Sequence, residues 1–377
     1  MNRRHFIGLA GGSVALAGTG AYLLSDRSSF SRADLRPTAA ASGWAGLIKW
    51  QPDEQLILEL AALAPSGHNT QPWAVRYVAP YRWVVCNDPT RWLPGVDPTQ
   101  REKLLSIGAF LHNLEYAANS LGYRCQFTQL AQTNQDEAVV AVVCSKAAAV
   151  SAFDVQHIRD RRTVRSGLLT TALRQADQAA LFPATAEGFH YIPNTAPEWH
   201  QLNEQTIEAN RLQAARPVAR QELADWIRFS NRDVAAHRDG LTTAGMEITG
   251  VSGWVVRNFY ARARVLSAGF GQQTLDQVRA QVGQSAGWLL LTSRDTTVAS
   301  LLDTGQRLQH LLLQIRRRGL AVHPMTQVLE EPATRRALRQ TLGLPGEVQF
   351  LLRIGYLKAY PAPVSLRRPV AWFTHAA

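Results

Sequence analysis

The sequence predicts an α+β fold that consists of two halves with matching outlines. Each half has a long helix that is preceded and closed by a glycine, over residues 108–122 in the first half and 305–319 in the second. An apolar run that predicts a strand accompanies each helix. These outlines favour an internal duplication. Two unrelated α+β halves stay open as the alternative, because the halves share little sequence identity.

The first half, about residues 44–150, alternates helical and extended patterns. An apolar run after Asp53, a residue type that often caps helices, predicts a helix that stops at Pro65. A second, long amphipathic helix keeps its leucines near one face. The expected helices cover residues 51–64 and 101–121, and the expected strands cover residues 73–78, 83–87 and 138–144.

The second half, residues 151–377, has a similar pattern of a strand, a long helix and two more strands. Residues from about 198 to 284 have no obvious place in the core that the two halves share. We interpret them as an insertion that either forms a lid over a binding site or only packs against the rest of the protein. The expected helix covers residues 303–317, and the expected strands cover residues 288–292, 320–323 and 349–356.

The composition is that of a globular protein, since 46% of the 377 residues are hydrophobic and 18% are charged. The net charge is +11, and almost all basic residues are arginine, which suits bidentate contacts with phosphate. The arginines are spread along the chain without a recognisable nucleic-acid-binding module, so we expect no nucleic-acid partner. Three cysteines without close spacing, and no clustered Cys/His pattern, argue against a metal site.

The first 43 residues are interpreted as a targeting segment and a linker. Arg3, Arg4 and Phe6 precede a glycine-rich apolar stretch, which resembles a twin-arginine export signal. We therefore expect the twin-arginine export machinery as a partner and a periplasmic or otherwise exported protein. Residues 6–24 are nearly long enough to span a bilayer, so cleavage of the signal and retention as a membrane anchor both stay open.

The most informative segment is the loop after the first helix, Ala-Pro-Ser-Gly-His-Asn-Thr-Gln-Pro-Trp at residues 64–73. Its small residues let backbone N–H groups and amide side chains approach a flat polar heterocycle. A second string, Arg-Arg-Thr-Val-Arg at residues 161–165, opens the second half. The loop resembles the flavin-contacting loop of the nitroreductase superfamily, and the string resembles the Arg-x-Ser/Thr-x-Arg/Lys segment at the start of its subunits. The tandem halves and the insertion look most like the Acg-type branch, over about residues 44–373.

This resemblance implies a nitroreductase-like fold and the cofactor FMN, which lies at the subunit interface of the homodimers that are usual in the superfamily. The loop occurs only in the first half of this chain and the arginine string only in the second. We therefore expect two fused halves that form an intramolecular pseudo-dimer, with one complete flavin site in the seam between them.

In the loop, the resemblance implies that Pro65 packs on the flavin ring and that Ser66 and Asn69 form hydrogen bonds with the flavin and its ribityl chain. Gln71 is a further candidate for contact with the flavin. For Gln71, as for Trp73, the alternative is a structural role. No side chain is expected to be catalytic, because the flavin N5 carries the chemistry.

The resemblance also implies that Arg161 and Thr163 contact the phosphate of FMN. Arg165 would lie by the pyrimidine edge, where a cation stabilises the reduced ring, or else be a surface arginine. Arg367 and Arg368 resemble the superfamily's terminal basic pair and are further candidates for contact with the phosphate, with a solvated charged tail as the alternative.

After the second long helix, Pro324, Met325 and Thr326 take the place of the segment that faces N5 and O4 of the ring in the superfamily. Well-studied relatives carry an acidic residue and a glycine here, so their substrate preference is not transferred to this chain.

The sequence thus predicts an exported FMN-dependent oxidoreductase that passes two electrons to a small-molecule acceptor such as a nitro compound or a quinone. The expected electron donor is NAD(P)H or, because NAD(P)H is scarce outside the cytoplasm, a redox partner. One alternative is a non-catalytic protein that binds or sequesters FMN in a lidded site. Another is a membrane-tethered partner of a quinone-linked reductase.

Overall fold

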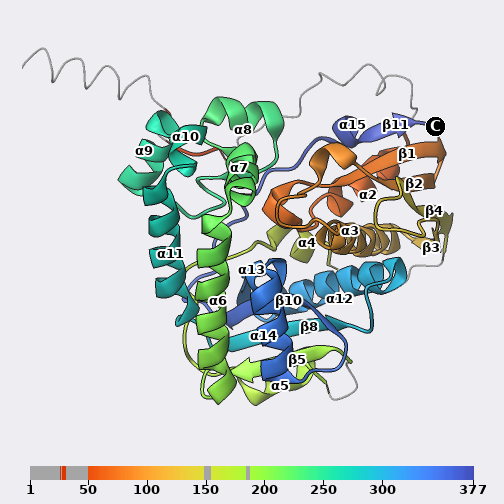
Figure 1. The fold of residues 1–377 in the computed structure, drawn as a ribbon. Coiled ribbons are helices and arrows are strands. Elements are labelled where there is room, and N and C mark those ends of the chain that lie inside the picture. The colour runs from red at the N-terminus through yellow and green to blue at the C-terminus, as the bar shows by residue number, and fades with distance from the viewer. Residues whose placement is uncertain (1–25, 27, 31–49, 148–153, 184–186) are drawn as a thin grey trace, which may run out of the picture.

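The computed structural model describes residue 26 and residues 28–30, 50–147, 154–183 and 187–377. Figure 1 shows two sheets with two long helices, α3 and α12, packed between them, and a group of helices along one side. Most of the expected targeting segment and linker lies outside the described residues. No helix in the described part of the chain is both long enough and apolar enough to cross a membrane.

The first sheet has the strand order β11-β1-β2-β4-β3, and all its neighbours are antiparallel except β1 and β11. Its first-half elements are α2 (Pro52–Ala61), β1 (Trp73–Ala79), β2 (Arg82–Asn87), α3 (Arg101–Ser120), β3 (Tyr123–Gln129) and β4 (Ala138–Lys146). The helices and strands expected in this half are confirmed, with ends shifted by a few residues. Strand β3 was not expected, because polar side chains such as Arg124 and Gln126 interrupt its apolar positions.

The second sheet has the order β5-β8-β10-β9 and is antiparallel throughout. Its elements are β5 (Phe189–Pro193), β8 (Gly287–Ser293), α12 (Val298–Arg317), β9 (Leu320–Pro324) and β10 (Glu347–Tyr356). Helix α12 begins before the expected residue 303, because the Thr297 hydroxyl accepts a hydrogen bond from the Ser300 amide and caps the helix. The elements β5, β8, α12, β9 and β10 have the same chain order and sheet order as β1, β2, α3, β3 and β4.

Helices α3 and α12 approach closely at one glycine from each. A Cβ atom at Gly108 would overlap the carbonyl oxygen of Leu302, and a Cβ atom at Gly305 would overlap the carbonyl oxygen of Leu105. The contact is reciprocal, because Gly108 faces the α12 backbone one turn before Gly305, and Gly305 faces the α3 backbone one turn before Gly108. These are the two glycines that mark the start of corresponding segments in the sequence.

Two further contacts between these helices are related in the same way. The Gln309 side-chain amide donates to Asn113 Oδ1 at 2.7 Å, and the rings of His112 and His310 lie 5.4 Å apart in an edge-to-face arrangement. When Gly108 is aligned with Gly305, His112 aligns with Gln309 and Asn113 aligns with His310. The Gln309–Asn113 contact therefore corresponds to the His310–His112 contact. The helix pair therefore has an approximate internal two-fold relation.

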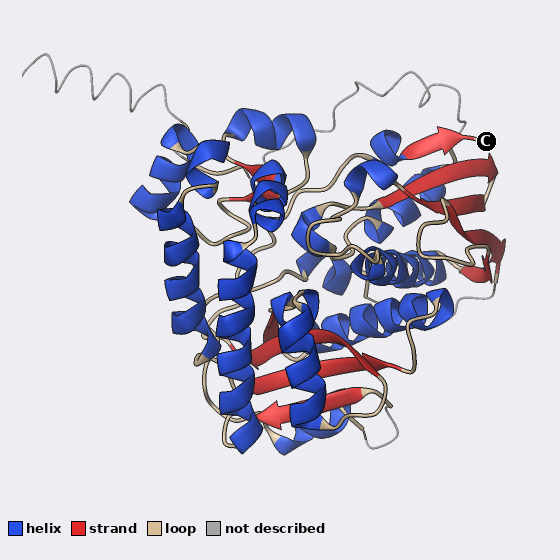
Figure 2. Ribbon diagram, viewed as in Figure 1, coloured by secondary structure: helices blue, strands red, loops and turns tan. Residues whose placement is uncertain are grey.

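The insertion consists mainly of helices, as Figure 2 shows along the side of the molecule. Its helices are α6 (Pro197–Ala215), α7 (Pro217–Trp226), α8 (Asn231–His237), α9 (Gly250–Phe259), α10 (Arg262–Val265) and α11 (Ala268–Val282), and its short strands are β6 (Ile227–Arg228) and β7 (Leu241–Thr242). The insertion begins after β5 and ends before β8. It thus occupies the place of the tight β1–β2 turn in the first half.

The remaining elements lie between these strands and long helices or follow β10. They are the turns η2 (Gly67–Asn69) and η3 (Pro89–Arg91), the helices α4 (Gln156–Asp160), α5 (Gln175–Leu181), α13 (Gln327–Glu330), α14 (Pro332–Leu342) and α15 (Val370–Phe373), and the strand β11 (Thr374–Ala376). After β10 the chain returns to the first half, where β11 pairs in parallel with β1. The C-terminal segment therefore ties the second half to the first.

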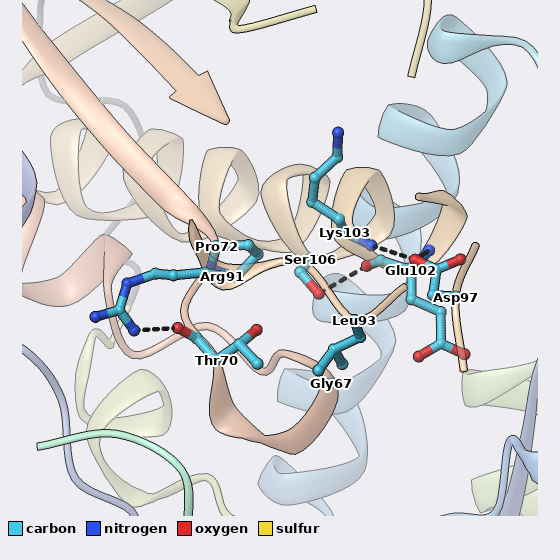
Figure 3. Close-up of a pocket in the computed structure, with 9 residues that line it drawn as sticks. All are labelled: Gly67, Thr70, Pro72, Arg91, Leu93, Asp97, Glu102, Lys103 and Ser106. Carbon is cyan, nitrogen blue, oxygen red and sulfur yellow. Dashed lines mark hydrogen bonds between the residues drawn. The ribbon is translucent and has the colours of Figure 1, made fainter. Parts of the chain in front are cut away.

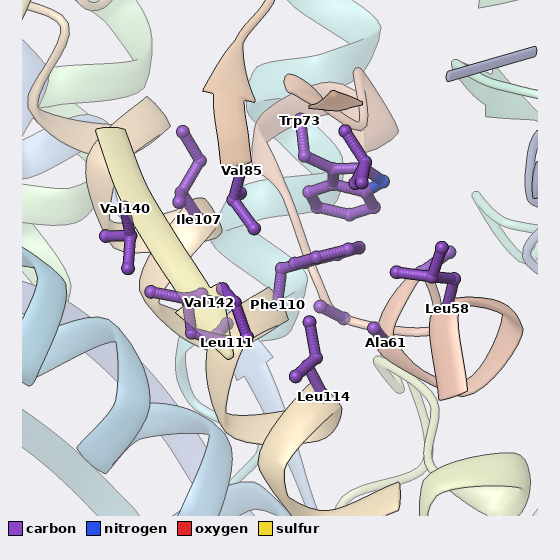
Figure 4. Packing of buried hydrophobic residues seen from close by; sticks show 14 of the residues in the cluster. Leu58, Ala61, Trp73, Val85, Ile107, Phe110, Leu111, Leu114, Val140 and Val142 are labelled. Carbon is purple, nitrogen blue, oxygen red and sulfur yellow. The ribbon is translucent and has the colours of Figure 1, made fainter. Parts of the chain in front are cut away.

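The first-half core lies between α2, α3 and the first sheet, as Figure 4 shows. Trp73 is fully buried there, with its ring centroid 5.1 Å from that of Phe110. This confirms the structural role that was the alternative for Trp73. Because Trp73 directly follows the loop of residues 64–72, its burial fixes one end of that loop.

Candidate functional site

The loop predicted to contact a ligand has an unusual backbone. His68, Asn69 and Gln71 all have positive φ angles, of 48°, 56° and 53°. Such angles are rare for residues other than glycine and cost about 1–3 kcal/mol each, so surrounding contacts must impose them. One such contact closes the loop, since Ser66 Oγ accepts a hydrogen bond from the backbone N–H of Gln71 at 2.9 Å. Strained backbone of this kind is concentrated at ligand-binding sites.

Arg367 holds the start of this loop. Helix α2 stops before Pro65, and its last carbonyl groups need donors from elsewhere. The Arg367 guanidinium donates to the carbonyls of Ala62 at 2.6 Å and Ala64 at 3.0 Å, and to Asn69 Oδ1 at 2.8 Å. A cation at a helix C-terminus is also favoured by the helix dipole. Arg367 therefore lies at the loop, where these three bonds hold protein atoms together, and its predicted contact with the phosphate stays a prediction.

Asn69 is similarly engaged. Its amide nitrogen donates to the carbonyls of Gly240 at 3.2 Å and Leu366 at 3.3 Å. The side chain thus joins the loop to the insertion and to the C-terminal segment. In this arrangement Asn69 shapes the loop, and its predicted contact with a flavin stays a prediction.

Gln71 and Arg368 form a buried tether. Gln71 is fully buried, and its Oε1 accepts from the Arg368 amide at 2.8 Å. The Arg368 guanidinium donates to the carbonyls of Gln71 at 2.6 Å and Trp73 at 2.8 Å. Burial, followed by the charge of Arg91, lowers the pKa of Arg368 to about 9. Arg368 is therefore not part of a solvated tail. The structure favours a tethering role for both residues over the predicted ligand contacts.

The arginine string of the second half meets the loop of the first half. Arg161 is only 7% exposed, and its guanidinium donates to the carbonyl of Leu63 at 3.3 Å. Arg367 donates to the same carbonyl at 3.3 Å. The string is positioned by strand β9, since the Val164 amide donates to the Val322 carbonyl at 3.1 Å. Thr163, between these anchors, is half-buried.

Arg161 has an incompletely satisfied guanidinium. Its buried Nε–H has no hydrogen-bond partner, and no carboxylate of the described residues forms an ion pair with it. Burial lowers the pKa of this arginine. A buried cation without an anionic partner costs free energy, and an anionic ligand would reduce that cost.

Arg165 lies near two histidines from different halves. Burial, followed by the charge of Arg165, lowers the pKa of His68 to about 4 and lowers the pKa of His323 well below its ordinary value. Both imidazoles are therefore neutral at neutral pH. Glu247, from the insertion, faces Arg165 but accepts hydrogen bonds from the Arg162 guanidinium and the Arg165 amide, both at 3.0 Å. Among these residues, the two arginines thus outnumber the one carboxylate.

The segment after β9 differs from the prediction. Met325 is 3% exposed and packs with Trp288 and Leu351 in the core of the second half. Its amide donates to the Leu351 carbonyl at 2.9 Å, so this N–H is not free for a flavin N5. Met325 is therefore a core residue, and its predicted ring contact is not supported. Pro324 and Thr326 are half-buried, and the Thr326 hydroxyl donates to Glu330 Oε1 at 3.0 Å.

A cluster of carboxyl groups beneath the loop, with Asp97 buried and Glu102 and Glu330 half-buried, was missed by sequence reasoning. Figure 3 shows Glu102 and Asp97 beside Gly67 in a small hollow. A Cβ atom at Gly67 would lie 3.3 Å from Glu102 Oε2. Burial, followed by the charge of Glu330, raises the pKa of Glu102 well above its ordinary value. No sequence signal joins these acids, because α3 and α13 are far apart in the chain.

Comparisons with known proteins give relatives that cover most of the chain. No family model matches it. The chain is 26% identical to "Probable NAD(P)H nitroreductase PigM" of Serratia sp., over 84% of this chain and 91% of the relative. It is 30% identical to "Putative NAD(P)H nitroreductase Rv3131" of Mycobacterium tuberculosis, over 84% of this chain and 89% of the relative. It is 26% identical to "Putative NAD(P)H nitroreductase acg" of the same species, over 83% and 92%.

Proposed function

Since this chain belongs to the nitroreductase superfamily, in its Acg-type branch, and is an oxidoreductase, we propose that it binds FMN between its halves. In this proposal the reduced flavin passes two electrons to a nitro compound, a quinone or a similar small acceptor. The names of the relatives favour NAD(P)H as the electron donor.

One observation carries the proposal. Arg161, a buried arginine of the second half, lies against the loop of the first half, and its Nε–H has no hydrogen-bond partner among the described residues. A dianionic phosphate would accept that hydrogen bond and balance the charge. The donor set fits this group, because the nearby histidines are neutral and Glu247 is already bonded to Arg162.

The fused-halves interpretation is part of this proposal. It is supported by the matching strand order of the two sheets and by the reciprocal contact of Gly108 with Gly305. In a fused pair, the seam between the halves replaces the subunit interface of a homodimer. This would explain why the loop and the arginine string occur once each and on opposite sides of the seam.

The protein side of the chemistry can be assigned to particular residues. Bound FMN would supply a ring that accepts a hydride and returns two electrons. Arg161 and Thr163 would hold the phosphate, and Pro65 and Ser66 would line the ring and ribityl chain. Arg165 would stabilise negative charge on the reduced ring.

His323 can be assigned a proton. Its Nδ1 lies 2.6 Å from an Arg353 guanidinium nitrogen, which can only donate. Nδ1 therefore accepts, and the ring proton lies on Nε2. In the proposed site this Nε2–H is a hydrogen-bond donor that adds no charge.

Two measurements test the proposal. The absorption spectrum and flavin stoichiometry of the purified chain should show about one FMN per chain, as expected for one complete site. Anaerobic mixing with NADPH should then bleach the flavin band, and a nitro compound or quinone should restore it. A colourless protein that ignores added FMN would contradict the proposal. A bound flavin that no nicotinamide nucleotide reduces would favour a sequestering protein or a separate redox partner.

Export through the twin-arginine pathway is proposed from Arg3, Arg4 and the apolar stretch that follows them. The described chain starts against the insertion, where the Asp26 carbonyl accepts from Arg257 Nε at 2.9 Å and the Asp26 amide donates to Asn258 Oδ1 at 3.0 Å. Fractionation of cells that make the full chain, or a chain without residues 1–25, tests this proposal. Cytoplasmic full-length protein would contradict it, and membrane-bound protein would favour retention of the segment as an anchor.

A further inference from the structure

Two of the three cysteines lie opposite each other on neighbouring strands. Cys125 of β3 is the direct register partner of Cys144 of β4, and their sulfur atoms are 3.0 Å apart. The sequence separates these residues and gives no spacing motif. Only the pairing of the two strands brings them together.

The strand geometry suits a disulfide. Directly opposed residues of antiparallel strands have Cα atoms about 4.5–5.5 Å apart. A disulfide requires Cα atoms about 4.4–6.8 Å apart and a sulfur–sulfur bond of about 2.05 Å. The sulfur atoms of Cys125 and Cys144 therefore need to approach by about 1 Å, which side-chain rotation can supply. No rearrangement of the strands is needed.

We propose that Cys125 and Cys144 form a reversible disulfide by exchange with a small-molecule or protein disulfide. One cysteine sulfur attacks the external disulfide and forms a mixed disulfide with loss of one external thiol. The other cysteine sulfur then attacks, the Cys125–Cys144 bond forms, and the second external thiol leaves. The two protein thiols are oxidised, the external disulfide is reduced to two thiols, and their two protons pass to those thiols.

Cys125 is the more accessible of the pair. It is half-buried, whereas Cys144 is 6% exposed. The contact with Cys144 and burial raise the pKa of the Cys125 thiol, so little thiolate is present at neutral pH. Because thiolate is the attacking species, exchange should be slow at neutral pH and faster as the pH rises.

The disulfide would act on the edge of the first sheet. Strand β3 pairs only with β4 among the described strands and therefore lies at the edge of the sheet that they form. A covalent bond between β3 and β4 would hold this edge strand in register and restrict the unfolded chain. We therefore expect a higher unfolding temperature for the oxidised protein than for the reduced protein.

The third cysteine provides an internal control. Cys86 lies on β2, and its sulfur contacts the Arg76 guanidinium at 3.7 Å and the Val84 carbonyl at 3.6 Å. Both contacts are with atoms other than sulfur. Cys86 should therefore stay a thiol under conditions that oxidise the other two cysteines.

The test uses the purified full chain, reduced and then incubated with oxidised glutathione at mildly alkaline pH. Free thiols counted after denaturation should fall from three to one, and non-reduced peptide mapping should link Cys125 to Cys144. Cys86→Ser should oxidise like the native chain and leave no free thiol. Cys125→Ser should not form the link, and its unfolding temperature should be the same with and without the oxidant.

Three results would overturn the proposal: three free thiols after oxidation, a link that involves Cys86, or a stable glutathione adduct on Cys125 that does not resolve. If Cys125→Ser fails to fold, the peptide map of the native chain decides alone. The result does not depend on flavin binding, so it can fail while the proposed function stands.

Discussion

Replacing Arg161 by alanine should weaken FMN binding while leaving the fold intact. The guanidinium is buried and donates one hydrogen bond to a backbone carbonyl, and its Nε–H has no partner in the described part of the chain. The Leu63 carbonyl keeps its hydrogen bond from Arg367 when this side chain is removed. A phosphate would lose a charged hydrogen bond worth about 1.5–3 kcal/mol, which corresponds to an FMN dissociation constant raised by about 10- to 150-fold.

The assay compares FMN with riboflavin, which has the same ring and ribityl chain without the phosphate. Flavin-free protein is titrated with each ligand and the quenching of flavin fluorescence is followed. Arg161→Ala should weaken FMN binding but leave riboflavin binding nearly unchanged. Arg161→Lys should restore part of the loss, because lysine keeps the charge but not the planar fork.

Arg294→Ala is the matched control, since the Arg294 side chain is 90% exposed and should not affect either ligand. Equal losses for FMN and riboflavin in Arg161→Ala would show that Arg161 only shapes the loop. An unchanged affinity for FMN in a folded variant would refute the assignment of Arg161 to the phosphate.

Further predictions concern stability and pH. Gly305→Ala should destabilise the chain by about 1–3 kcal/mol or more, because its Cβ atom would overlap the α3 backbone; Gly283→Ala, in open space, should change the urea midpoint little. Because the folded-state pKa of His68 is about 4 against an ordinary 6.5, the folded chain binds fewer protons, and stability should fall as the pH drops from 6.5 towards 4. His68→Asn, which tolerates a positive φ, should flatten this slope in urea unfolding at several pH values, and an unchanged slope would contradict the assignment. Arg165→Gln should raise the pKa of His68 in an NMR titration, and no change would place Arg165 away from that ring.

The sequence by itself determined the elements whose signals are local. Helices α2 and α3 and strands β1, β2, β4, β8, β9 and β10 were predicted because their apolar residues repeat at the helical or strand period. The loop of residues 64–73 and the string of residues 161–165 were recognised because each is a short contiguous motif. Their division between the two halves is equally a property of the sequence, because it depends only on where each motif lies along the chain.

Only the tertiary structure decided what each candidate residue touches. Met325 and Arg368 were predicted to contact the cofactor, but one is packed in the second-half core and the other tethers the C-terminal segment. Glu102 and Glu330, and likewise Cys125 and Cys144, are brought together from separate elements. The reason is that burial and strand pairing depend on which distant segments meet, and a local pattern carries no information about that.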